Sequence, residues 1–332
     1  MTNKNQILLR CFSKFVCAAT LFLIFAGGMV TSTGSGLSVP DWPLSYGGFF
    51  PPMVGGIFYE HGHRMIASVV GLLMVILAVW IARVETRRWV KMLSFAALGT
   101  VIAQGILGGV TVLLFLPPQV SVAHAVLGQT FFILTIILAY SQSEERRLRE
   151  SETYLPGNPN QVELALGFVL LIYIQLMVGA VMRHTGSGLA IPDFPKMGGQ
   201  WIPVFDTNML NLINDWRFEM NLPSVKLQQV LIHFMHRIGA VFIIMMVAYL
   251  TYCFWDHAKK NKKVFDSLVT INILLILQVI LGIYTVLTQK SPHVTSLHVA
   301  LGAAFLGMSV LIALRILPLS INGCNTSLKK SK

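Results

Sequence analysis

The chain has 332 residues, of which 55% are hydrophobic and 12% are charged. An average soluble domain has roughly 45–50% apolar and about 25% charged residues. The mean hydropathy of +0.68 therefore excludes a soluble globular enzyme, and the composition also excludes a disordered chain, a coiled coil and a disulfide-stabilised scaffold. The net charge of +11 does not by itself indicate a nucleic-acid partner, because membrane proteins collect Lys and Arg on one face.

Eight apolar stretches are long enough to cross about 30 Å of hydrocarbon, which takes roughly 20 helical residues. They lack the period-two alternation of barrel strands, and only helices and closed barrels satisfy their backbone groups in lipid. The sequence therefore predicts an all-α integral membrane protein with eight transmembrane helices. The predicted spans are 15–32, 62–82, 92–115, 121–141, 162–182, 229–254, 265–287 and 294–317.

The basic residues predict the orientation of these spans. Eighteen of the 25 Lys and Arg fall on the side of the two termini, and seven fall on the opposite side. Because Lys and Arg accumulate in cytoplasmic segments, both termini are expected in the cytoplasm, and the charge requires no nucleic acid. The first span follows Lys4, Arg10 and Lys14 without a longer leader, so we expect a retained helix in a bacterial inner membrane.

The chain contains an internal repeat. Residues 33–43 and 185–195 are identical at eight of eleven positions with an offset of 152, and residues 104–128 and 278–302 are identical at twelve of 25 with an offset of 174. Each half then holds four spans in the same order, which predicts two pseudo-symmetric four-helix bundles in parallel orientation. The expected divisions are an N-terminal bundle at 1–142, a cytoplasmic linker at 143–160 and a C-terminal bundle at 161–332.

The second half carries an insertion within about 196–228. Its apolar residues are spaced loosely like one face of a helix that lies on the outer surface. A lid over a site and a plain surface helix both fit this pattern. The residues of this face are Met209, Leu210, Leu212, Ile213, Trp216 and Met220.

Four of the nine histidines recur between the halves. His63 matches His236 near the outer starts of spans two and six, and His124 matches His298 near the outer starts of spans four and eight. Ionisable groups within a membrane are costly and tend to mark sites. Two imidazoles per bundle are too few for a closed zinc site but suit the two axial positions of a heme. The pattern predicts one heme per bundle, toward the outer face.

A carboxylate distinguishes the two bundles. Glu60 precedes His63 by three residues and shares its helical face, whereas the equivalent residue of the second half is His233. Glu60 is expected to accept protons or to orient a ligand or water. A solvated interfacial glutamate is the alternative interpretation.

Other charged residues recur beside the histidines. Arg64 and Arg237 follow His63 and His236 directly, and they could pair with heme propionates or cap a loop. Gly-Ser-Gly and Pro-Asp elements predict tight turns just outside spans one and five. Their aspartates, Asp41 and Asp193, are expected to fasten the outer loops or cap a short helix, with contact to a heme edge as the alternative interpretation.

Together these motifs resemble those of the heme A synthases, which convert heme O to heme A for cytochrome oxidase assembly. The resemblance covers essentially the whole chain and implies oxidation of a ring methyl of heme O to a formyl group by successive hydroxylations. The motifs are E-H-G-H-R at 60–64, F-M-H-R at 234–237, A-H-A-V-L-G-Q at 123–129, L-H-V-A-L-G at 297–302 and the two T-G-S-G-L…P-D loops.

The resemblance also implies roles for single residues. His63 and His124 would ligate the iron of the substrate heme, with Glu60 as the catalytic residue. His236 and His298 would ligate the iron of a heme b cofactor. One departure is that some bacterial members carry a cysteine pair in an outer loop, which this sequence lacks.

The resemblance further implies heme O as substrate and contacts with membrane lipid. Heme O synthase, cytochrome oxidase assembly factors, an unidentified electron partner and a second copy of the chain are the expected protein partners. Spacing alone leaves a diheme membrane cytochrome open, since bis-histidine bundles also carry electrons without modifying heme. A transporter is disfavoured, because its polar site would lie at the membrane midplane.

Overall fold

The computed structural model describes residues 3–151 and 156–318. Within these ranges the chain is helical and contains no extended strand, which confirms the all-α prediction. Eight long helices correspond one to one with the predicted spans. The helices are α1 (Asn3–Ser32), α2 (Gly55–Val84), α3 (Arg88–Leu113), α4 (Pro118–Ser141), α5 (Glu144–Ser151), α6 (Pro159–His184), η1 (Ser187–Leu189), α7 (Thr207–Glu219), α8 (Leu227–Lys260), α9 (Lys262–Leu287) and α10 (Pro292–Ile316).

Each membrane helix begins before its predicted span, whereas α3 and α10 end one or two residues before theirs do. α1 has 30 residues and α8 has 34, so at 1.5 Å per residue each is at least about 45 Å long. The hydrocarbon core is only about 30 Å thick. Hydropathy delimits the part of a helix that lies in lipid, and it cannot locate polar helix ends that continue into the aqueous loops. The length and composition of these eight helices make the chain a multi-pass membrane protein.

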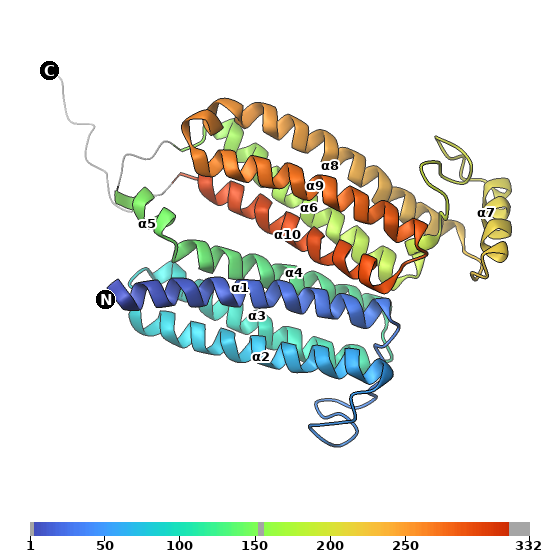
Figure 1. The fold of residues 1–332 in the computed structure, drawn as a ribbon, viewed down its shortest axis with the longest axis horizontal. Helices are drawn as coiled ribbons and strands as arrows, with labels where there is room; N and C mark the ends of the chain where they lie inside the picture. The colour runs from blue at the N-terminus through green and yellow to red at the C-terminus, as the bar shows by residue number, and fades with distance from the viewer. Residues whose placement is uncertain (1–2, 152–155, 319–332) are drawn as a thin grey trace.

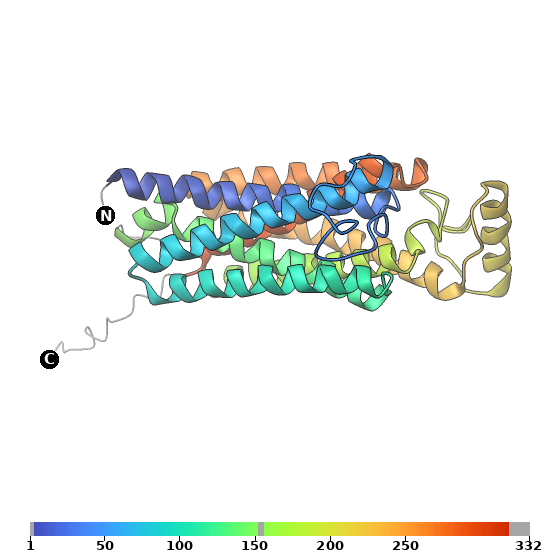
Figure 2. The ribbon, with the colours of Figure 1, turned by 90° about the horizontal axis from the view of Figure 1, so that it is seen from below.

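The eight helices form two groups that lie side by side (Figure 1). One group contains α1, α2, α3 and α4, and the other contains α6, α8, α9 and α10. The groups meet where α1 and α4 contact α10 and where α4 contacts α6. Seen from below, the membrane helices run roughly along one common direction (Figure 2). This arrangement is consistent with a duplicated four-helix unit.

The start of α1 and the end of α10 lie at one end of the molecule, here called the terminal end (Figure 1). The helices α2, α4, α8 and α10 begin at the opposite end, here called the histidine end.

The turns before α4 and α10 each place two consecutive residues in the left-handed region. These are Phe115 (φ 58°) and Leu116 (φ 59°), and Gln289 (φ 51°) and Lys290 (φ 65°). The two pairs are separated by the same offset of 174 as their flanking repeats.

The predicted linker contains a short helix, α5, which contacts both groups. Glu144 accepts a hydrogen bond from Arg10 of α1 at 2.7 Å. Glu145 accepts two from Arg315 of α10, both at 2.9 Å. Because the two carboxylates bind opposite groups of helices, α5 joins the groups at the terminal end as well as connecting them in sequence.

The insertion forms α7, which lies beyond the membrane helices at the histidine end (Figure 2). Met209 and Ile213 are buried against the loop that carries Asp193, while Leu212 and Met220 of the predicted face are exposed. Arg217 is on the inward face instead and donates a hydrogen bond to the carbonyl of Pro223 at 2.8 Å. The helix therefore packs on the second-half loop, and its apolar face was only partly predicted.

Candidate functional site

The four duplicated histidines occupy equivalent places in the two groups. His63 and His236 lie in the third turns of α2 and α8, and His124 and His298 lie in the second turns of α4 and α10. All four helices begin at the histidine end, so the four rings lie near the same depth. The structure therefore brings the four rings to one end of the molecule.

Each histidine ring faces a glycine of the neighbouring helix. A Cβ added to Gly27, Gly108, Gly179 or Gly282 would lie 3.0–3.2 Å from the Cε1 atom of His63, His124, His236 or His298 respectively. That spacing is too tight for an ordinary side chain, so the glycines make room for the rings. Sequence reasoning did not assign this role, although the four glycines recur at the offsets of 152 and 174 that define the repeat.

The two duplicated histidines of the second group lie close together. The ring centres of His236 and His298 are 6.4 Å apart with an interplanar angle of 74°. Metal–imidazole bonds are about 2 Å long, so two of them plus the distances to the ring centres span about 6 Å. The spacing therefore allows one metal atom to lie between the two rings. His63 and His124 occupy the equivalent places in the first group.

Several ring nitrogens in these pairs are buried without a hydrogen-bond partner. They are the Nδ1 atoms of His63, His124 and His298. Buried polar groups in proteins normally have partners. Among the described residues no group of three His, Cys, Asp or Glu side chains could hold a metal ion. Paired imidazoles with unsatisfied nitrogens, seated against glycines, fit a heme held by two axial histidines.

Glutamines donate hydrogen bonds to the backbone beside two of these rings. Gln104 donates to the carbonyl of His124 at 2.8 Å, and Gln175 donates to the carbonyl of His236 at 2.8 Å. Gln175 also lies 3.2 Å from Nδ1 of the His236 ring. The position equivalent to Gln175 in the first half is Leu23, so the environments of the two pairs differ.

Glu60 is buried and clamps the first outer loop to α2. Its Oε2 accepts a hydrogen bond from the backbone N–H of Val39 at 2.8 Å, and its Oε1 accepts one from Arg64 at 2.7 Å. Arg64 also donates to the carbonyls of Val39, Asp41 and Leu44. The carboxylate is therefore an engaged, buried group, which rules out the solvated interfacial glutamate.

The second half builds the same clamp with a histidine. His233 Nδ1 accepts from the backbone N–H of Ile191 at 3.1 Å, and Arg237 lies 3.2 Å from His233 Nε2. Arg237 also donates to the carbonyls of Ile191, Asp193 and Lys196. A neutral imidazole has one acceptor nitrogen and can serve only one of these donors, whereas a carboxylate serves both. The two arginines thus hold loops in this structure, and their contact with heme propionates stays a prediction.

Asp41 and Asp193 fasten the turns of the outer loops, as expected. Asp41 accepts hydrogen bonds from the backbone N–H groups of Tyr46 and Gly47 at 2.7 and 2.9 Å. Asp193 accepts the equivalent pair from Gly198 and Gly199, both at 2.9 Å. The hydrogen bonds from Gly47 and Tyr46 lower the pKa of the Asp41 carboxyl.

Comparison with known proteins identifies the family of the chain. The COX15-CtaA family, described as cytochrome oxidase assembly protein, matches residues 54–310. The chain belongs to this family. The matched region contains Glu60 and all four duplicated histidines.

Named relatives within the family cover most of the chain. The heme A synthase of Halalkalibacterium halodurans is 27% identical over 87% of this chain and 91% of its own length. That of Lysinibacillus sphaericus is 26% identical over 90% of this chain and 93% of its own. That of Bacillus licheniformis is 29% identical over 56% of this chain, and that match spans 62% of the relative.

Arg183 joins the two groups of helices in this protein. This role was not predicted from the sequence. Arg183, at the end of α6, donates to the carbonyl of Gly28 at 2.5 Å and to the hydroxyl of Ser32 at 2.7 Å in α1. Ser296 of α10 donates to Ser32 at 3.1 Å. The repeat offers no signal for Arg183, because the equivalent position in the first half is Thr31.

Proposed function

We propose that this protein is a heme A synthase, which oxidises a ring methyl of heme O to the formyl group of heme A by successive hydroxylations. The observation that carries the proposal is the family match over residues 54–310, which includes both histidine pairs. Relatives matched over 87% and 90% of the chain are named heme A synthase. These names do not support the alternative of a diheme cytochrome that leaves its heme unmodified.

We assign the two histidine pairs different roles. His63 and His124 hold the substrate heme O, and His236 and His298 hold a heme b cofactor. When bound, heme b supplies one-electron redox chemistry, while the protein supplies position and electrostatics. The glycine facing each ring supports ligation by both pairs, because it lets the helices approach closely while each imidazole keeps its orientation.

Glu60 is proposed to accept the protons released as the methyl group is oxidised. It lies one helical turn from His63 and is only 3% exposed. Each of its oxygens accepts one hydrogen bond, and a carboxylate has about four acceptor sites, so both oxygens retain capacity for another donor. The second half has His233 at the equivalent position, which is consistent with chemistry in the first half only.

The orientation and partners follow from the same proposal. The bias of Lys and Arg toward the terminal end supports termini in the cytoplasm of a bacterial cell and heme sites toward the outer face. Heme O synthase, as the source of the substrate, and cytochrome oxidase assembly factors, as recipients of the product, are the proposed partners. An electron acceptor is also required, because conversion of a methyl to a formyl group is an oxidation.

The test is co-expression of the chain with a heme O synthase in a bacterium that makes no heme A, followed by extraction and chromatography of the hemes. The proposal predicts heme A or its hydroxylated precursor. A strain that expresses the heme O synthase alone is the control and should contain heme O without heme A or its hydroxylated precursor. Heme O without any oxidised product, in membranes that contain the folded protein, would contradict the proposal.

A further inference from the structure

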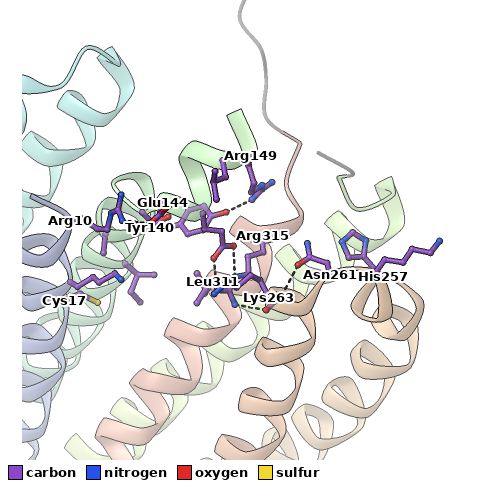
Figure 3. Close-up of a pocket in the computed structure, with 17 residues that line it drawn as sticks. Arg10, Cys17, Tyr140, Glu144, Arg149, His257, Asn261, Lys263, Leu311 and Arg315 are labelled. Atoms are coloured by element: carbon purple, nitrogen blue, oxygen red, sulfur yellow. Dashed lines mark hydrogen bonds and ion pairs between the residues drawn. The ribbon is translucent and has the colours of Figure 1, made fainter. Parts of the chain in front are cut away.

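A cavity of about 940 Å³ lies at the terminal end, between the two groups of helices. Its walls come from both groups and from α5 (Figure 3). Arg10 and Cys17 of α1 lie on one side, and Arg315 of α10 with Lys263 of α9 on the other. The cavity is therefore at the opposite end of the molecule from the histidine pairs, and the proposed heme chemistry does not account for it.

The cavity is strongly basic. Its lining contains six Lys and Arg side chains and two carboxylates. Both carboxylates are engaged, since Glu144 binds Arg10 and Glu145 binds Arg315. The basic residues are Arg10, Lys14, Arg149, Lys260, Lys263 and Arg315.

Three of these cations have no counter-charge among the described residues. The ammonium groups of Lys14, Lys260 and Lys263 form no hydrogen bond or ion pair there, although they line one cavity. The Nε atom of Arg10 is also buried and lacks a partner in the described part of the chain. The three lysines are exposed, and an anion bound in the cavity would supply the counter-charge that the described residues do not provide.

Some apolar residues of the lining lie deeper in the membrane helices than its charged residues, although Leu148 lies on α5. Ile136 precedes the end of α4, and Leu311 precedes Arg315 by one turn of α10. Cys17 follows Lys14 along α1 toward the membrane interior. The lining therefore changes from basic at the helix ends to apolar within the membrane, which matches the polarity of a phospholipid from its phosphate to its acyl chains.

We propose that this cavity binds the headgroup of an anionic phospholipid, whose phosphate is held by basic residues of the lining. Basic pockets between membrane helices bind such headgroups in other proteins. The bound lipid would link α1 of the first group to α8 and α9 of the second, at the end where α5 already joins them.

The test uses the full-length protein, purified in mild detergent and stripped of lipid. Phosphatidylglycerol is titrated in mixed micelles, with phosphatidylcholine as the neutral lipid, and bound lipid is counted by native mass spectrometry. The cavity variant combines Lys14→Gln, Lys260→Gln and Lys263→Gln. The matched control combines Lys4→Gln, Lys259→Gln and Lys262→Gln, which removes the same charge from the terminal end but outside the cavity lining.

The proposal predicts one tightly bound phosphatidylglycerol in the wild type and in the control, and at least about tenfold weaker binding in the cavity variant. Equal binding by the two triple variants, or equal binding of phosphatidylcholine, would overturn it. Displacement of the lipid by millimolar inorganic phosphate would assign the cavity to a free anion instead. Unchanged thermal midpoints in both variants would show that the substitutions leave the fold intact.

Discussion

Loss of the loop-clamping arginine should cost far more stability in the first half than in the second. In Arg64→Met, three loop carbonyls lose their donor and the buried carboxylate of Glu60 loses its counter-ion. Removal of one partner from a buried ion pair costs about 3–5 kcal/mol. In Arg237→Met the loop carbonyls again lose their donor, but His233 can remain neutral, so lost hydrogen bonds alone should cost about 1–3 kcal/mol.

The two single variants should therefore differ by about 2 kcal/mol, which corresponds to several degrees in the thermal midpoint at about 2–4 °C per kcal/mol. The assay is thermal unfolding of the purified proteins in the same detergent. The double variant Glu60→Gln/Arg64→Met removes the unpaired charge and should regain part of the stability lost in Arg64→Met. Equal midpoints for Arg64→Met and Arg237→Met, or no recovery in the double variant, would refute the reasoning.

Three further outcomes are expected. Glu60→Gln should retain heme but abolish oxidation of heme O, whereas His233→Gln should retain activity; an active Glu60→Gln variant would remove the proposed proton acceptor. Gly282→Leu should lose heme from the second pair by optical spectroscopy, while Gly99→Leu, where an added Cβ meets no atom within 4 Å, should keep it. Burial is the largest single influence on Glu85 and raises its pKa, but the hydrogen bonds from Arg87 and Gln142 and the charge of Arg87 together lower the pKa from 4.5 to about 2. The ionised carboxylate should therefore stabilise the fold above about pH 4.5, and this stability should be lost as the pH falls toward 2. The measurement is the thermal midpoint of the wild type and of Glu85→Gln as a function of pH, and identical profiles would contradict the expectation.

The membrane spans and the four histidines could be predicted because each has a direct signal in the sequence. Lipid requires long apolar stretches, and an internal repeat separates duplicated residues such as His63 and His236 from those that occur once. The helix ends could not be predicted from the same signal. Polar residues at the start of α1 and at the end of α8 continue the helices into water, where hydropathy no longer constrains them.

The partners of the site residues were harder to predict. Glu60 shares a helical face with His63, and this spacing indicated a role beside the ring. Its contacts with Val39 and Arg64 could not be predicted, because they depend on how the outer loop folds back onto α2. The glycines that face the rings lie on other helices, so their role follows from packing between helices. Arg183 contacts α1 across the two groups, and no periodicity within a single helix could indicate such a contact.

The heme content of histidine variants tests the assignment of the two pairs most directly. Each variant is purified from cells that make heme O, and its bound hemes are extracted and identified by chromatography. His63→Ala/His124→Ala should lose heme O and heme A but retain heme b. His236→Ala/His298→Ala should lose heme b, and His293→Ala, which has no counterpart in the repeat, should resemble the wild type. If both double variants retained every heme, or if both lost the same heme, the division into a substrate pair and a cofactor pair would be wrong.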